Sequence, residues 1–173
     1  MKNTITLFSA FLVMLMFLSC NNKKEKKQIK KDKYQGVISP SLYHDLVNDK
    51  EARTRLWKAA IDSGDCEAYG KIGTAYLMTY REVDLYYYSL IMANKYHCAY
   101  AYFVMHTILT HEASPDGMTI LSNDKDTKNL ALYYLLKAKE LGSDEAQFSI
   151  EEEFGKGKPV PNSSFFLKQL TNP

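Results

Sequence analysis

Histidines are the first candidates for chemistry, because imidazole binds metals and transfers protons near neutral pH. His97, His106 and His111, with Glu112 beside the last, lie in one stretch of the chain. His106 and His111 are five residues apart, whereas two metal ligands on one helix face are four apart, and there is no His-Glu-x-x-His motif. We therefore expect packed or exposed histidines, with no metal site and no cofactor.

Carboxylates are the second candidates, since a pair of them could act as general acid and base. They cluster at Glu140, Asp144, Glu145 and Glu151 to Glu153, but carboxylates on successive helical turns without a cleft normally form a solvated face. The sequence has no Gly-x-Ser-x-Gly turn and no phosphate-binding glycine loop. We expect a protein that is not an enzyme. The competing hypothesis is a hydrolase that uses His106 and the 111–126 loop.

The connection between Thr110 and Asp126 is longer than a compact helical array usually needs. A long ordered loop is often functional, and the alternative is a neutral insertion in a surface connection.

One pattern of small, aliphatic and large apolar residues occurs three times along the chain. A glycine or histidine is followed at four-residue steps by alanine, by isoleucine or methionine, and by a large apolar residue. The three sets are Gly64, Ala68, Ile72, Tyr76; His97, Ala101, Met105, Leu109; and Gly142, Ala146, Ile150, Phe154. Amphipathic helices are predicted upstream, at about 49–63, 82–96 and 127–141. Such spacing is typical of stacked helical hairpins, in which the small residue lets two helices approach closely.

The third unit resembles the SEL-one-like repeat, a relative of the tetratricopeptide repeat. The matching positions are Ala131, Tyr134, Lys137, Ala138, Gly142, Ala146, Gln147, Phe154 and Gly157. The first unit matches at Lys58, Ala59, Ala60, Gly64, Ala68, Ile72, Gly73 and Tyr76, while the middle unit has His97 and His106 in place of glycines. The resemblance covers about residues 49–161. It implies an all-α fold, a helical-hairpin solenoid of about three repeats, and a protein that acts as an adaptor or scaffold.

Four further expectations concern the ends and turns of this solenoid. Residues 40–47 are predicted to form a short N-terminal cap, and residues 163–170 a C-terminal capping helix. Gly142 is expected to meet the packed turn between two helices and to need a left-handed backbone. Cys66 and Cys98 fall in equivalent turns about 10 Å apart, farther than a disulfide spans, so two buried thiols are favoured over a bridge.

The N-terminus predicts export and a lipid anchor. An apolar run from Leu7 to Leu18 is too short to span a bilayer and has the length of a signal-peptide core. Ser19 and Cys20 follow it, which resembles a bacterial lipoprotein signal; an ordinary secretory signal is the alternative. We predict a signal peptide at 1–19, lipidation at Cys20, a disordered lysine-rich tether at 20–35 and a helical repeat domain at 36–173. The predicted location is the bacterial envelope, facing the periplasm or at the outer membrane.

Charge separates the tether from the domain. Residues 23–33 carry seven lysines against Glu25 and Asp32, whereas residues 34–173 carry fourteen Lys and Arg against eighteen Asp and Glu. An acidic domain argues against a nucleic-acid partner, which needs basic side chains opposite its phosphates.

These features predict a non-catalytic module that binds a protein partner. The expected contact residues are the tyrosines of the first helices, Tyr86, Tyr87, Tyr88, Tyr133 and Tyr134, because tyrosine offers a large contact area at low entropy cost. Small size and a divergent middle repeat fit an immunity protein that neutralises a toxin, and an envelope assembly or regulatory adaptor is the alternative.

Overall fold

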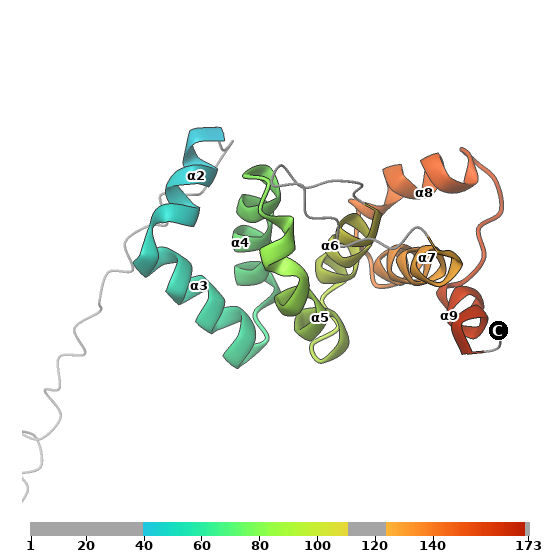
Figure 1. Cartoon of the computed structure of the whole chain (residues 1–173), viewed down its shortest axis with the longest axis horizontal. Helices are drawn as coiled ribbons and strands as arrows, with labels where there is room; N and C mark the ends of the chain where they lie inside the picture. The colour runs from blue at the N-terminus through green and yellow to red at the C-terminus, as the bar shows by residue number, and fades with distance from the viewer. Residues whose placement is uncertain (1–39, 111–123, 172–173) are drawn as a thin grey trace, which may run out of the picture. The chain divides into compact units, whose positions relative to one another are not determined.

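The computed structural model describes residues 40–110 and 124–171, all of which lie in the compact unit Val37–Pro173. These residues form helices and no strand, which confirms the predicted all-α class (Figure 1). The elements are α2 (Pro40–Asn48), α3 (Lys50–Ser63), α4 (Cys66–Met78), the 3₁₀ helix η1 (Glu82–Leu85), α5 (Tyr86–Asn94), α6 (Ala99–Thr110), α7 (Lys125–Glu140), α8 (Ala146–Phe154) and α9 (Ser163–Thr171). The predicted signal peptide, the tether and most of the 111–126 loop lie outside the described residues.

Neighbouring helices pack in pairs along the chain. Helix α3 packs on α4, α5 on α6, and α7 on both α6 and α8. The two predicted end helices are confirmed, since α2 covers α4 and α9 packs on α7. Each of the three upstream helices predicted from the sequence is present. The middle one is divided, because a 3₁₀ turn, η1, precedes α5.

The three turn positions aligned from the sequence share one backbone conformation. Gly64, His97 and Gly142 have φ angles of 70°, 55° and 90°, all in the left-handed region. In each turn the next residue donates its backbone N–H to a carbonyl of the preceding helix, from Asp65 to Ala59, from Cys98 to Met92 and from Ser143 to Ala138. His97 therefore replaces glycine without changing the turn, although a left-handed backbone is unfavourable for a residue with a Cβ atom.

The small residues that open the second helices are buried as expected. Ala68, Ala101 and Ala146 are at most 5% exposed, and the aliphatic residues one turn later are buried as well. The expectation for Gly142 is half correct. Its backbone is left-handed, but a Cβ atom added there would meet nothing within 4 Å, because the turn faces open space.

Helix starts are fixed by aspartates that accept backbone hydrogen bonds. Asp49, Asp65 and Asp124 each lie in an extended conformation, and their carboxylates accept N–H groups of the first turn of α3, α4 and α7. This N-cap is the favoured way to satisfy donors that have no partner inside the helix. Asp124 places the start of α7 two residues before the predicted position.

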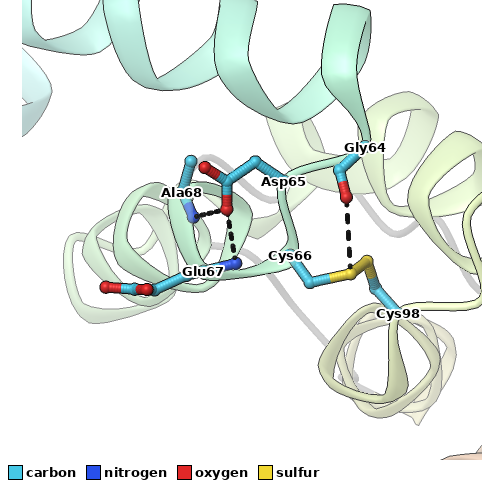
Figure 2. The surroundings of a disulfide bond; sticks show 6 residues. All are labelled: Gly64, Asp65, Cys66, Glu67, Ala68 and Cys98. Carbon is cyan, nitrogen blue, oxygen red and sulfur yellow. Dashed lines mark hydrogen bonds between the residues drawn. A yellow bond between two sulfur atoms is a disulfide. The ribbon is translucent and has the colours of Figure 1, made fainter.

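The expectation of two buried thiols is wrong. Cys66 and Cys98 form a disulfide, with Cα atoms 5.6 Å apart (Figure 2), well inside the range that a disulfide spans. The 10 Å expected for equivalent positions does not apply, because Cys66 is the first residue of α4 whereas Cys98 lies just before α6. The bridge ties the starts of these two helices together. Cys98 is buried, but Cys66 is exposed.

Candidate functional site

The tyrosines at the start of α5 differ in exposure because the core face of this helix is fixed by other residues. Leu85, Ser89 and Met92 follow helical spacing and are fully buried. Tyr86 and Tyr87 therefore face outward, with 38% and 66% of their surface exposed. The hydroxyl of Ser89 donates to the carbonyl oxygen of Leu85 at 2.8 Å.

Ser89 also holds α5 against α4. Its oxygen lies 2.6 Å from the hydroxyl oxygen of Tyr69, a fully buried residue of α4. Burial raises the pKa of Tyr69, and the hydrogen bond to Ser89 offsets only part of that effect. This buried polar pair fixes the face that α5 turns toward solvent.

Tyr88 is half-buried because it stacks on the ring of Trp57 from α3. The two ring centroids are 4.1 Å apart, with an interplanar angle of 23°. Tyr87 packs edge-on against Tyr88 at 5.8 Å, and Trp57 packs edge-on against Tyr76 of α4 at 5.7 Å. We call the row Tyr87, Tyr88, Trp57 and Tyr76 the aromatic row. It connects three helices and ends at an exposed tyrosine.

An ion pair supports the other end of the aromatic row. The guanidinium of Arg81 lies over the ring of Tyr76, 4.9 Å from its centroid. The same guanidinium donates to the carboxylate of Asp84 at 2.6 and 2.9 Å. Because its direction is fixed by Asp84, the cation–π contact is held in place. The aromatic row is thus held at its Tyr76 end, whereas its Tyr87 end is exposed to solvent.

Two further exposed residues occur where α4 ends. Met78 and Tyr80 are 58% and 67% exposed. Tyr80 has a φ of 56°, which costs about 1 kcal/mol for a residue with a side chain. Sequence reasoning missed both residues, as well as Trp57. The single tryptophan of the chain could have marked Trp57 as a candidate contact residue. Nothing in the sequence indicates the left-handed backbone of Tyr80.

The two remaining predicted contact residues, Tyr133 and Tyr134 of α7, are less exposed than Tyr86 and Tyr87. Tyr134 is 5% exposed, so most of the surface that we predicted to contact a partner is covered by neighbouring residues. It packs against Tyr102 of α6, with ring centroids 5.7 Å apart, and burial raises its pKa. Tyr133 is half-buried against the same pair. Helix α7 is covered by α6 on this face, which buries one of two consecutive tyrosines.

Of the histidines singled out from the sequence, His106 is buried between helices and His97 is exposed at a turn. His106 is buried, and its Nδ1 atom lies 3.2 Å from the carbonyl oxygen of Ala131 in α7. Burial lowers the pKa of His106, and this hydrogen bond opposes the shift. His97 is exposed, with Nδ1 3.4 Å from the hydroxyl of Tyr102. His111 and Glu112 lie outside the described residues, and within the described part no three His, Cys, Asp or Glu side chains gather as metal ligands would.

Among the clustered carboxylates at positions 140–153, Glu140 accepts the most hydrogen bonds. It accepts the backbone N–H and the hydroxyl of Ser163 at 2.8 and 2.9 Å, and the ammonium of Lys137 at 3.1 Å. Partial burial raises the pKa of Glu140, but these donors outweigh burial and lower the pKa overall. Its role in the structure is to hold the start of α9 against the end of α7.

No family model, curated protein or solved structure matches this chain. The resemblance to SEL-one-like repeats therefore rests on the matching sequence positions alone. In the part of the chain that the structure describes, no helix is long and apolar enough to cross a bilayer.

Proposed function

We propose that this protein is a non-catalytic protein-binding module, held in the bacterial envelope by a lipid on Cys20. In this proposal α3 to α8 form three SEL-one-like hairpins of a short solenoid, and α9 closes the stack. The observation that carries the proposal is the aromatic row, which ends at the exposed ring of Tyr87 and rests on Trp57 and the Arg81–Asp84 pair.

Exposed aromatic rings that are supported by neighbouring rings are well suited to binding a protein. A tyrosine brings a large apolar surface and a hydroxyl, and a ring that is already held in place loses little entropy on binding. Tyr87 packs edge-on against Tyr88, which is in turn stacked on Trp57. Energetically dominant contact residues are most often Trp, Tyr and Arg. The row contains Trp57 and three tyrosines, and Arg81 lies over its Tyr76 end.

Within this class we propose an immunity protein, which binds and neutralises a toxin delivered by a neighbouring cell. The short chain, the small number of hairpins and the departure of the middle hairpin from the repeat pattern fit an inhibitor made for one partner. The middle hairpin also carries Tyr86 and Tyr87. An envelope assembly or regulatory adaptor is the alternative, and the identity of the captured partner separates the two. The hydrolase hypothesis has less support, because His106 is buried against α7.

The decisive experiment compares two exposed aromatic residues. The tagged full-length protein, Tyr87→Ala and Phe148→Ala are used to capture partners from solubilised native envelopes, followed by mass spectrometry. Phe148 is a matched control, because it is 70% exposed but lies on α8. Affinity for the captured protein is then measured with purified components. We expect Tyr87→Ala to weaken binding by about 2 kcal/mol, roughly thirtyfold, and Phe148→Ala to change it little.

The result is interpretable only for variants that keep the melting temperature of the wild type. Equal affinities of wild type and Tyr87→Ala, with a loss in Phe148→Ala, would move the binding surface to α8. A captured toxin that the protein inhibits supports the immunity role, whereas an assembly factor supports the adaptor role.

A further inference from the structure

A small pocket lies between α7, α8 and the segment that leads into α9. Its volume is about 330 Å³, at the lower end of the range for ligand pockets. Leu136 and Ile150 contribute buried apolar side chains from α7 and α8, and Val160 and Pro161 contribute the opposite wall. Val160 is 40% exposed, so the pocket opens to solvent beside an apolar side chain.

The charge in this pocket comes from Lys139. The other ionisable residue in its lining, Glu140, is engaged with Ser163 through both carboxylate oxygens and is compensated by Lys137. Lys139 is exposed, and among the described residues no carboxylate forms an ion pair with it. An apolar pocket with one uncompensated ammonium group at its edge complements a ligand that combines an apolar group with one negative charge.

Two side-chain amides, those of Gln147 and Asn162, also line the pocket. Gln147 donates through Nε2 to Glu151 at 2.8 Å, which leaves its carbonyl oxygen directed elsewhere as an acceptor. Asn162 accepts from the backbone of Phe165 and from Ser164 through Oδ1, so its Nδ2 group remains as a donor. The lining residues therefore include a cation, a side-chain donor and a side-chain acceptor.

We propose that this pocket binds the C-terminal residue of a polypeptide, with its apolar side chain against Leu136, Ile150 and Val160 and its carboxylate on the ammonium of Lys139. A terminal carboxylate supplies the anion, its second oxygen can accept from Asn162, and the last backbone N–H can donate to Gln147. An apolar residue inside a peptide chain lacks the carboxylate, and a simple fatty acid lacks the N–H group. The pocket is built by helices other than those of the aromatic row, so it can be tested separately from partner capture.

The test uses the full-length protein in lipid nanodiscs and a fluorescent pentapeptide of glycine and serine that ends in leucine. Binding is followed by fluorescence anisotropy for the free acid, for its C-terminal amide and for a free acid that ends in glycine. We expect the leucine acid to bind at least tenfold more tightly than either of the other two probes. Lys139→Gln should reduce its affinity to that of the amide, whereas Lys128→Gln, an exposed lysine of the same helix outside the pocket, should not change it.

Three results would overturn the proposal. One is equal binding of acid and amide, and another is unchanged affinity in Lys139→Gln with an unaltered circular dichroism spectrum. The third is no saturable binding of the leucine acid up to about 1 mM. A fourth result, displacement of the peptide by octanoate with equal or higher affinity, would also overturn the proposal and assign the pocket to acyl carboxylates. Val160→Ser gives a second check, because it should weaken the leucine acid while leaving the weak binding of the glycine acid unchanged.

Discussion

The ring of Tyr96 lies against the backbone of Gly64, and its hydroxyl donates to the carbonyl oxygen of Ile61 at 2.7 Å. A Cβ atom at Gly64 would lie 2.7 Å from Cε1 of that ring and closer still to Cδ1. This contact holds the C-terminal end of α3 against the turn that follows α5. Glycine is required at position 64 for two reasons. The backbone is left-handed, and the ring of Tyr96 leaves no space for a Cβ atom.

Alanine at three glycines should separate these two reasons. Gly142→Ala should lower the free energy of unfolding by about 1 kcal/mol, the cost of a left-handed backbone alone. Gly64→Ala should cost about 2 kcal/mol or more, because Tyr96 must also move. Gly70→Ala should be neutral or stabilising by up to about 1 kcal/mol, since Gly70 is helical and its nearest neighbour would be 4.0 Å away. Denaturant unfolding followed by circular dichroism measures all three, and equal losses at Gly64 and Gly142 would contradict the placement of Tyr96.

The Cys66–Cys98 disulfide should contribute substantially to stability. It closes a loop with a sequence separation of 32, for which the chain-entropy estimate is about 3 to 4 kcal/mol. Reduction with dithiothreitol should lower the melting temperature, and Cys66→Ala/Cys98→Ala should melt at the temperature of the reduced wild type. The double variant is also the control, because reductant should leave its melting unchanged. A reduced wild type, verified by thiol titration, that melts like the oxidised protein would contradict this expectation.

His106 should make stability depend on pH. Burial lowers its pKa in the folded protein below the ordinary value of 6.5, so the unfolded chain binds a proton at a higher pH than the folded chain does. Stability should therefore fall as pH decreases through about 6.5, and the fall should end below the folded-state pKa. Unfolding titrations between pH 7.5 and about pH 5 measure the slope.

Two variants identify the group responsible. His106→Gln should flatten the dependence of stability on pH over this interval, even if its stability is lower throughout. His97→Gln, at an exposed histidine, should retain the dependence. If both variants keep the wild-type slope, another group takes up the proton.

Lipidation of Cys20 is tested by fractionation. Cys20→Ala should release the protein from membranes or leave the unprocessed precursor, because the proposed anchor is attached to the cysteine thiol. Wild type and Cys66→Ala/Cys98→Ala, which keep Cys20, should both remain in the membrane fraction. An unchanged distribution and precursor size in Cys20→Ala would rule out the lipid anchor.

The sequence by itself determined the helices and the turns between them, because these depend on local interactions. Apolar periodicity placed the hairpin helices, and the aligned positions Gly64, His97 and Gly142 marked turns with the same left-handed backbone. Even where histidine replaced glycine, the surrounding apolar pattern was sufficient to locate the turn. The start of α7 was misplaced by two residues, since the capping role of Asp124 decides it.

Only the tertiary structure decided which side chains are exposed, which cysteines are bonded and where the pocket lies. Tyr86, Tyr87 and Tyr88 are identical in type and consecutive, yet Tyr88 is covered by Trp57 from another helix. Tyr134 is buried because α6 packs on α7. The disulfide depends on how closely the starts of α4 and α6 approach, and the Lys139 pocket on how the chain returns from α8 to α9. These are distances between segments far apart in the chain, and periodicity within one helix carries no information about them.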